Sequence, residues 1–492
     1  MNNSTKKDLT VVIGGGPAGL TTAYELSKHG KKSVVFEKAD RVGGISRTET
    51  YKGYRFDIGG HRFFTKVGEV EQLWQEVMGD EFIKVPRLSR IYYKNRFFSY
   101  PLEPYNALSN LGIMNSTLIM WSYVKAKIKP SPVEENFEQW VSNRFGKRLY
   151  ETFFKTYTEK VWGIPCTEIR ADWAAQRIKG LSLRKAIINA LFGSNDTKTL
   201  IKEFNYPVYG PGQMWERFQQ KLDEVGSPVH LHTEVTEIER EGDRVNSVTI
   251  KQNGETQKVT GDHFVSSMPV SLLLKKMNPA PPESVLKAAS SLKYRDFLIV
   301  SLVVDQAELF PDNWIYIHSP EFRVGRIQNF KNWSKAMVPD LSKTCLGMEY
   351  FCNEGDSLWQ MSKDQLVELA SREVKALGLV NPEVKIEDGT VIRQYKAYPV
   401  YDDQYRQNVE IIQEYIQKFE NLQTVGRNGM HRYNNSDHSM LTGLLAAKNI
   451  LGEEHDLWNV NVERSYHEEF TNSKDAYSDL KKPNKESLAI SQ

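Results

Sequence analysis

Apolar and polar positions at the start of the chain predict a strand, a helix and a second strand. Residues 9–13 are an apolar run of β-favouring residues, and 20–29 have the spacing of an amphipathic helix that ends before a glycine. Another apolar run occupies 33–36. The glycine-rich segment 14–19 joins the first strand to the helix, so the order is that of a parallel βαβ unit.

Further along the chain the periodicity changes. Helical spacing of aromatic and aliphatic residues recurs in 107–128, 135–160 and 173–202. Residues 228–267 alternate in strand fashion with turn residues between the runs, which predicts a meander followed by a returning strand. The β-rich runs of 290–350 predict one further sheet. Residues 420–452 return to a strand, turn and helix pattern.

These patterns predict an α/β protein with a discontinuous first domain. We expect a Rossmann-like nucleotide-binding domain of the glutathione-reductase type, interrupted by a helical insert and by an antiparallel β-sheet substrate domain. The predicted boundaries are 1–103, 205–289 and 386–465 for the nucleotide-binding domain, 104–204 for the helical insert, 290–385 for the β-sheet domain and 466–492 for a polar C-terminal tail.

The segment after the first strand has the dinucleotide-binding pattern in its required context. Gly14 permits the tight turn, Gly16 lets the backbone approach a pyrophosphate, and Gly19 lets helix and strand pack closely. Pro17 and Ala18 open the helix, whose N-terminal amides point at the phosphates. Glu37, at the end of the second strand, can accept hydrogen bonds from a ribose diol.

A second glycine pair narrows the choice of dinucleotide. Glu37 is followed by Lys38 and, after Arg41, by Gly43 and Gly44. This arrangement resembles the FAD-specific extension of the fold, in which the second glycine pair and Arg41 contact the adenosine diphosphate again. The resemblance therefore implies FAD as the cofactor.

Composition excludes several other classes. The chain of 492 residues is long enough for two or three domains, and its 40% hydrophobic content excludes wholesale disorder. A net charge of +2 gives no general attraction to nucleic acid or acidic membrane, although it leaves local basic patches open. Three scattered cysteines form no disulfide framework or zinc pattern. Without an apolar leader or a membrane-length apolar run, we expect a cytoplasmic protein.

Several motifs together resemble a known family. The chain is similar to the FAD superfamily of amine oxidases and protoporphyrinogen oxidases, and within it to the UDP-galactopyranose mutases. The resemblance covers nearly the whole chain, and it rests on residues 56–61, 89–93, 100–101, 157–165, 173–177 and 426–439. General oxidases of the superfamily usually have Gly-Asp where this chain has Gly426 and Arg427.

The resemblance implies a reaction without net redox change. Reduced flavin acts through its N5 atom as a nucleophile on the anomeric carbon, so that the pyranose and furanose forms of a nucleotide-linked sugar interconvert. His61 is implied beside the flavin, where it responds to the redox state. The other cofactor contacts that the resemblance implies are Gly60, Arg90, Val235, Gly426, Arg427, Asn435, Asp437, His438 and Ser439.

The family also implies a substrate site for a UDP-linked sugar. Arg177 and Arg326 are expected to bind the leaving diphosphate, since arginine forks bind phosphate bidentately. Trp162 is implied beside the uridine or the sugar, although it would serve equally well as a core anchor. The remaining substrate contacts implied by the resemblance are Tyr100, Thr158, Tyr316, Tyr398 and Tyr433.

Three departures leave the substrate open. Thr158 stands where the family usually has Asn, Trp333 stands where tyrosine is common, and the loop from Tyr433 to Asp437 is shorter than in the long mutases. An oxidase or desaturase of the protoporphyrinogen oxidase type is the alternative enzyme, and a flavin-bearing binding subunit is a third reading. NAD(P)H as an external reductant and an oligomeric assembly also stay open.

Overall fold

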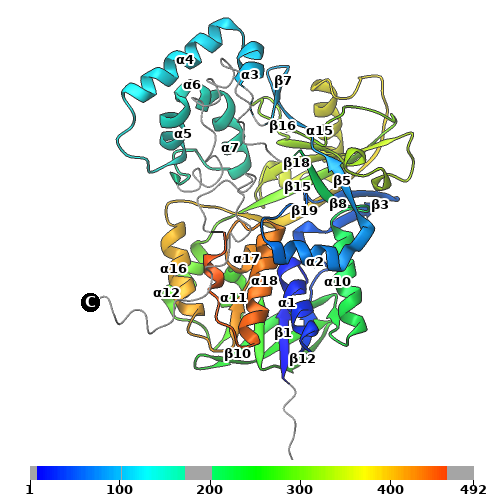
Figure 1. Cartoon of the computed structure of the whole chain (residues 1–492), viewed down its shortest axis with the longest axis vertical. Helices are drawn as coiled ribbons and strands as arrows, with labels where there is room; N and C mark the ends of the chain where they lie inside the picture. Colours follow the sequence, from blue (N-terminus) through cyan, green and yellow to red (C-terminus); the bar gives the residue numbers. More distant parts are fainter. Residues whose placement is uncertain (1–7, 101, 103, 172–201, 462–492) are drawn as a thin grey trace, which may run out of the picture.

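The computed structural model describes residues 8–461 except for 101, 103 and 172–201. Its nucleotide-binding part is built on a five-stranded parallel sheet, drawn in the lower half of Figure 1. The strand order is β20 (Leu422–Thr424), β13 (His263–Ser266), β1 (Leu9–Ile13), β2 (Lys32–Phe36) and β9 (Val229–His230). The central strand β1 is almost wholly buried, as its apolar run predicts.

Two helices pack tightly together on this sheet. They are α1 (Pro17–Lys28) and α18 (Ser436–Ile450), which lie side by side in Figure 1. Gly443 permits the close approach, because a Cβ there would lie 2.2 Å from the carbonyl oxygen of Ala18. Helices α10 (Gly212–Glu224) and α2 (Gly68–Met78) continue the same layer.

The predicted meander and returning strand are confirmed. Strands β10 (Thr233–Glu241), β11 (Arg244–Gln252) and β12 (Glu255–Thr260) pair antiparallel, and β13 then returns to the parallel sheet beside β1. The short strand β14 (Met277–Asn278) completes this four-stranded sheet. The neighbouring helices are α11 (Val270–Lys275), α12 (Glu283–Ser291) and α16 (Tyr405–Ile416).

A seven-stranded sheet forms the upper part of the molecule. It is antiparallel except where β6 runs parallel to β16. Alternation along its strands gives it two faces, of which one is covered by α15 (Lys363–Ala376) and the other carries the candidate substrate site. The order is β19 (Ile386–Pro399), β15 (Tyr294–Val304), β18 (Thr344–Cys352), β17 (Arg326–Asn329), β16 (Trp314–Ile317), β6 (Ser89–Tyr93) and β7 (Arg96–Ser99).

This strand pairing changes two of the predicted domain boundaries. The sequence assigned 1–103 and 386–465 wholly to the nucleotide-binding domain, yet β6, β7 and β19 pair within the seven-stranded sheet. Strand β19 lies along most of the buried β15, so non-local hydrogen bonding decides its place. The periodicity of a strand does not reveal its pairing partner, which explains the difference.

The helical insert follows the predicted pattern where the structure describes it. Helices α3 (Pro104–Leu111) and α4 (Ile113–Ile128) are followed by α5 (Phe137–Phe145), α6 (Lys147–Leu149), a π-helix over Tyr150–Lys155 and α7 (Thr156–Trp162). The predicted helix 173–202 lies almost entirely outside the described residues, as does the tail 466–492. No helix in the described part of the chain combines the length and apolar character needed to cross a membrane.

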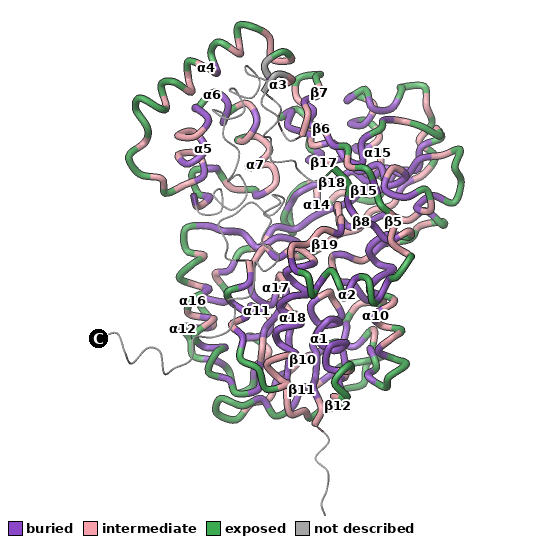
Figure 2. Tube along the Cα trace, in the orientation of Figure 1, coloured by how far each residue is buried: buried purple, intermediate pink, exposed green. Residues whose placement is uncertain are grey.

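Burial follows this layered arrangement. Buried residues run through the sheets and the α1–α18 pair, whereas the outer loops and most of α4 are exposed (Figure 2).

Shorter elements connect these layers. The remaining elements are β3 (Thr48–Tyr51), β4 (Tyr54–Asp57), β5 (Phe82–Pro86), β8 (Glu203–Pro207), α13 (Phe330–Trp333), α14 (Ser357–Gln360), α17 (Gly426–Gly429) and the 3₁₀ turns at Gly44–Ser46, Gly79–Glu81, Lys335–Met337 and Leu457–Asn459.

Candidate functional site

The glycine motif between β1 and α1 forms a cradle of backbone. Gly14 has φ of +103°, and a Cβ at Gly19 would lie 2.0 Å from its carbonyl oxygen, so both positions require glycine. A Cβ at Gly16 would meet no atom within 4 Å, which marks the open side of the turn. Gly16 caps α1 without a side-chain hydrogen bond, and Pro17 and Ala18 begin the helix. Its first amides therefore face the opening, as a pyrophosphate site requires.

Glu37 holds this cradle together. Its carboxylate accepts hydrogen bonds from the amides of Gly15 (2.7 Å) and Ala39 (2.8 Å). The second glycine pair packs against the same turn: the Gly43 amide donates to the Gly15 carbonyl at 2.8 Å, and a Cβ at Gly44 would lie 3.5 Å from the Gly16 Cα. The two glycine motifs thus form one continuous backbone surface.

Lys38 and Val235 lie where the second and tenth strands meet. The Thr233 amide donates to the Glu37 carbonyl, and Val235 is buried two residues further along β10. The pKa of Glu234 is lowered mainly by its hydrogen bond from Lys276 and further by charges that include Lys38. Both predicted positions therefore flank the acidic end of β2.

The N-terminus of α18 faces the same region from the other side. Gly426 has φ of +80°, and a Cβ there would lie 3.1 Å from the Ala18 Cβ, which places this turn against the start of α1. Asn435 is the N-cap of α18 without a side-chain hydrogen bond. Two helix N-termini thus converge beside glycine turns, an arrangement that fits a dinucleotide. The buried first turn of α18 carries Asp437, His438 and Ser439.

Aromatic and guanidinium groups gather on the face of the seven-stranded sheet opposite α15. Tyr398 and Tyr433 stack at a centroid distance of 5.6 Å, and Trp162 lies edge-on to Tyr398 at 6.2 Å. The Arg427 guanidinium lies over the Tyr433 ring at 4.6 Å. We call the following residues the aromatic–arginine cluster: Tyr157, Trp162, Tyr316, Arg326, Tyr398, Arg427 and Tyr433.

Arg326 joins the cluster to the glycine segment 58–60. Its Nε donates to the fully buried Glu349 at 2.7 Å, and Gln328 donates to the other oxygen of the same carboxylate at 2.8 Å. A Cβ at Gly59 would lie 3.5 Å from an Arg326 Nη atom and 3.9 Å from the Nε2 atom of His61. Burial would lower the pKa of Arg326, but the Glu349 carboxylate and nearby tyrosines raise it well above its usual value.

The local field at His61 is positive. Nε2 of this partly buried ring donates to the Ile58 carbonyl at 2.9 Å, because a carbonyl oxygen only accepts. The pKa of His61 is lowered to about 4, mainly by burial and in smaller part by the charges of Arg427 and Arg326. His61 is therefore neutral at pH 7, and a cation nearby would be disfavoured while an anion would be favoured.

Two further arginines, which sequence reasoning missed, extend this field. The guanidinium groups of Arg62 and Arg87 lie over the Trp314 ring at 5.6 Å and 5.7 Å. Burial raises the pKa of Tyr316, whereas Arg326, Arg62 and Arg87 act in the opposite direction. Arg62 directly follows the predicted site residue His61, and this adjacency is the one feature of the sequence that could have indicated its role. Nothing local in the sequence marks Arg87.

Helix α7 supplies one wall of the cluster and is held to the sheet by a partly buried lysine. Lys160 donates to the carbonyls of Ile317 (3.0 Å), Ser319 (3.2 Å) and Val324 (3.1 Å), in the turn that joins β16 to β17. Burial lowers the Lys160 pKa to about 8. Tyr157, one turn earlier on α7, lies 5.5 Å from the Tyr316 ring. Its contact with β16 brings the helical insert to the sheet.

The other predicted residues take several positions. Tyr100 lies 4.8 Å from the Tyr316 ring, and Thr158 is buried on α7. Gly60 and Trp333 are neighbours, since a Cβ at Gly60 would lie 3.5 Å from that indole. The Trp333 indole donates to the Asn313 carbonyl at 3.0 Å. Arg177 lies outside the described residues.

The structure does not bring Arg90 to the cluster. Successive side chains of β6 point to opposite faces of the sheet. Ile91 packs on the cluster face, so the neighbouring Arg90 lies on the opposite face. There its guanidinium binds Asp312 through two hydrogen bonds of 2.8 Å and 2.6 Å. The prediction that Arg90 helps to hold the flavin finds no support in this position, because strand alternation and the ion pair direct it elsewhere.

Comparison with known sequences assigns a family. The profile described as "Flavin containing amine oxidoreductase" matches residues 17–451. The flavin-containing amine oxidase B of Sus scrofa is 26% identical over 303 residues, which are 58% of this chain and 54% of that protein. A probable UDP-galactopyranose mutase of Klebsiella pneumoniae is 27% identical over 181 residues, 35% of this chain and 44% of that protein.

The fold is shared with a solved mutase structure. A crystal structure of reduced UDP-galactopyranose mutase superimposes with a TM-score of 0.80 at 22% identity, covering 90% of this chain and 94% of that chain. Identity at this level establishes the fold. The first curated relatives are matched over only 33% to 54% of their own length.

Proposed function

Since the chain belongs to the flavin-containing amine oxidoreductase family and its cofactor is accordingly FAD, we propose that it is a nucleotide-sugar mutase. The reaction would interconvert the pyranose and furanose forms of a sugar on a nucleoside diphosphate, as in UDP-galactopyranose mutase. One observation carries the proposal: the aromatic–arginine cluster lies beside His61, with Arg326 and Arg427 both contributing to a positive field. Such a field suits a departing diphosphate.

The chain's own residues would bind and orient the substrate. When bound in its reduced form, FAD supplies the nucleophilic nitrogen N5 for attack on the anomeric carbon. The forks of Arg326 and Arg427 would hold the diphosphate as it leaves and returns, since guanidinium groups bind phosphate bidentately. Hydroxyls of Tyr316, Tyr398 and Tyr433 would add donors on the cluster side. Neutral His61 would stand between this cluster and the cofactor cradle.

The alternative is an amine oxidase, which the longer sequence match to flavin-containing amine oxidase B favours. An amine substrate is a cation at pH 7 and would enter a region where burial, and then the charges of Arg427 and Arg326, already lower the pKa of His61. An apolar substrate would leave the Arg427 guanidinium beside a surface that solvates it poorly. Both substrate classes therefore fit the cluster less well than a diphosphate does.

Anaerobic turnover tests the proposed function. The purified flavoprotein is reduced with dithionite, supplied with UDP-galactopyranose or its furanose isomer, and the products are separated by chromatography. Interconversion by the reduced protein alone is expected. Oxidised protein serves as one inactive comparison. Reduced Arg427→Met protein serves as the other, with its activity expressed per bound flavin because Arg427 is also an expected cofactor contact.

Other outcomes would discriminate among the candidates. Bleaching of the oxidised flavin by an amine or a porphyrinogen, without any sugar interconversion, would replace the mutase by an oxidase. Binding of another nucleoside diphosphate sugar in preference to the UDP sugar would keep the reaction class and change the base. Arg217→Met provides a matched control for Arg427→Met, because this surface arginine pairs with Glu81 and lies on α10, which contributes no residue to the cluster.

A further inference from the structure

Helix α4 exposes large apolar side chains that the proposed function does not use. Ile113 is 89% exposed, Met114 76%, Trp121 67% and Ile128 78%. The helix forms the outer edge of the helical insert at the top of Figure 1, and Figure 2 colours much of it as exposed. Exposed apolar patches of this kind usually mark an interaction surface.

These side chains share one side of the helix. Met114, Leu118, Trp121, Lys125 and Ile128 follow each other at intervals of three or four residues, which places them in one stripe. Ile119 is the buried residue of α4 and faces the body of the protein. We call the exposed stripe, together with Ile113 and Val124, the α4 face.

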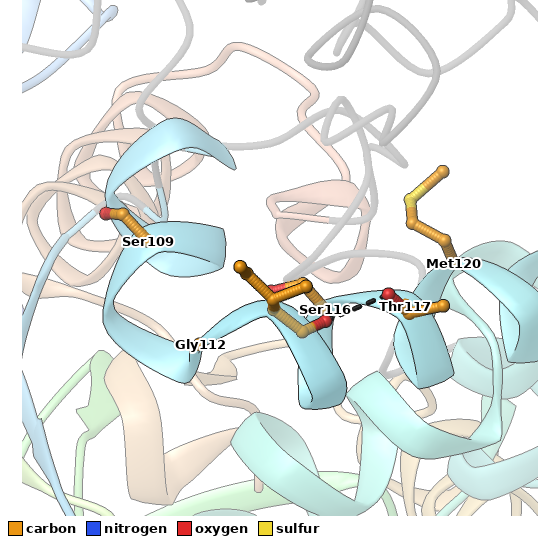
Figure 3. Close-up of a pocket in the computed structure, with 6 residues that line it drawn as sticks. Ser109, Gly112, Ser116, Thr117 and Met120 are labelled. Carbon is orange, nitrogen blue, oxygen red and sulfur yellow. Dashed lines mark hydrogen bonds between the residues drawn. The ribbon is translucent and has the colours of Figure 1, made fainter.

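A hollow adjoins the α4 face at the junction with α3. Ser109, Gly112, Ser116, Thr117 and Met120 line it along the two helices (Figure 3). The Thr117 hydroxyl donates back to the Ile113 carbonyl at 2.9 Å, so the helix itself satisfies this polar group. Small side chains and a flexible methionine thus leave room for an apolar group to enter.

The charged side chains of α4 and its C-cap are all positive, and the nearest acidic residue along the chain, Glu134, forms an ion pair with Arg144 and also interacts with Lys127. Residues 104–133 contain no aspartate or glutamate, and their charged residues are Lys125, Lys127 and Lys129 at the end of α4. The Lys125 ammonium lies 5.8 Å from the centre of the Trp121 ring. A tryptophan beside lysines on an otherwise apolar stripe is the composition of helices that lie in a membrane interface.

We propose that the α4 face docks on the surface of an anionic lipid bilayer. The helix of 16 residues is about 24 Å long, shorter than the roughly 30 Å hydrocarbon core, so it would lie in the interface rather than cross it. A second copy of the chain is a poorer occupant, because it would bring the same lysines together. Lipid phosphates instead complement the lysines while the apolar stripe enters the headgroup region.

Vesicle sedimentation tests this docking with the full-length flavoprotein. Vesicles of phosphatidylglycerol and phosphatidylcholine in equal amounts are compared with vesicles of phosphatidylcholine alone. We expect binding to the anionic vesicles that weakens as salt is raised, and at least tenfold weaker binding to the neutral ones. Replacing Lys125, Lys127 and Lys129 by Gln is expected to weaken anionic binding on the order of 100-fold.

Matched variants separate docking from folding. Trp121→Gln with Ile128→Gln removes apolar contact at exposed positions and should weaken vesicle binding at least tenfold, whereas Val225→Gln with Leu341→Gln, also exposed, should not. Equal binding to both vesicle types, or no binding to either, would overturn the proposal. Self-association in sedimentation velocity that only the α4 variants abolish, without vesicle binding, would replace the bilayer by a second copy.

Discussion

The cofactor cradle and the aromatic–arginine cluster are built by opposite strategies. The cradle is made of backbone from one short segment, in which Gly14, Gly16 and Gly19 clear the space and Glu37 fixes the turn. The cluster is made of side chains from α7, three strands, α17 and the turn between α17 and α18, which tertiary packing alone brings together. The cradle therefore tolerates no Cβ at Gly14 or Gly19, whereas the cluster depends on balanced charge.

The largest effect is expected where charge is balanced inside the cluster. Glu349→Gln leaves the Arg326 guanidinium without its buried counter-charge, and breaking a buried pair costs about 3–5 kcal/mol. Urea unfolding at pH 7 measures this loss. Glu420→Gln, whose carboxylate is 71% exposed beside Arg244, should cost less than about 1 kcal/mol. Equal losses in the free energy of unfolding for the two variants would show that the buried Glu349–Arg326 pair stabilises the fold no more than an exposed pair does.

The cradle should respond to a single methyl group. Gly19→Ala places a Cβ 2.0 Å from the Gly14 carbonyl oxygen, and overpacking of this kind costs about 1–3 kcal/mol. Part of that cost should appear as at least about tenfold weaker flavin binding, read from absorbance of the purified protein near 450 nm. Gly68→Ala, where a Cβ meets no atom within 4 Å, is the control. A normal flavin content in Gly19→Ala would contradict this account of the cradle.

His61 lies between the two regions and should make stability depend on pH. Its folded pKa of about 4 lies below the ordinary 6.5, so the unfolded chain binds the proton first. The contribution is fully present above pH 6.5 and is lost as the pH falls toward 4. His61→Gln should reduce the loss between pH 7 and pH 5 by about 1–2 kcal/mol in urea unfolding. His230→Gln, at an exposed position on β9, is the comparison, and an unchanged slope in His61→Gln would contradict the prediction.

The smallest effect concerns a single hydroxyl. Tyr398→Phe keeps the ring stacked on Tyr433 and removes one donor from the cluster. One hydrogen bond typically contributes about 0.5–1.5 kcal/mol net, so UDP affinity should fall roughly two- to tenfold while flavin content is unchanged. Isothermal titration against UDP measures this. Tyr415→Phe, on α16, is the control. An equal loss of UDP affinity in that variant would show that Tyr398 does not bind the substrate.

Much of the fold follows from local patterns in the sequence. The βαβ unit, the meander with its returning strand and the final strand–turn–helix were all predicted, because hydrophobic period and turn glycines specify them locally. The domain boundaries were predicted less well, since β6, β7 and β19 join a sheet whose other strands lie far along the chain. Pairing over such separations leaves no periodic trace.

The candidate site divides in the same way. Glycine positions and the acidic residue of the cradle are readable because each meets a steric or hydrogen-bonding demand within a few dozen residues. Glu349 offered a weaker signal, as one charged residue in an apolar strand that needs a partner. Its partner Arg326, the contribution of Arg62 and Arg87, and the turning of Arg90 to Asp312 were decided only in the folded molecule.

The sequence by itself determined the βαβ unit with its glycine cradle and the spacing of the helices that the structure describes in the insert. The tertiary structure alone decided which arginines share a field with His61 and which side of α4 is left exposed. The physical reason is the sequence separation over which each interaction acts. Steric fit in a turn and hydrophobic periodicity involve residues that are close in sequence, whereas the electrostatic balance and the burial of a group depend on every element that packs around it.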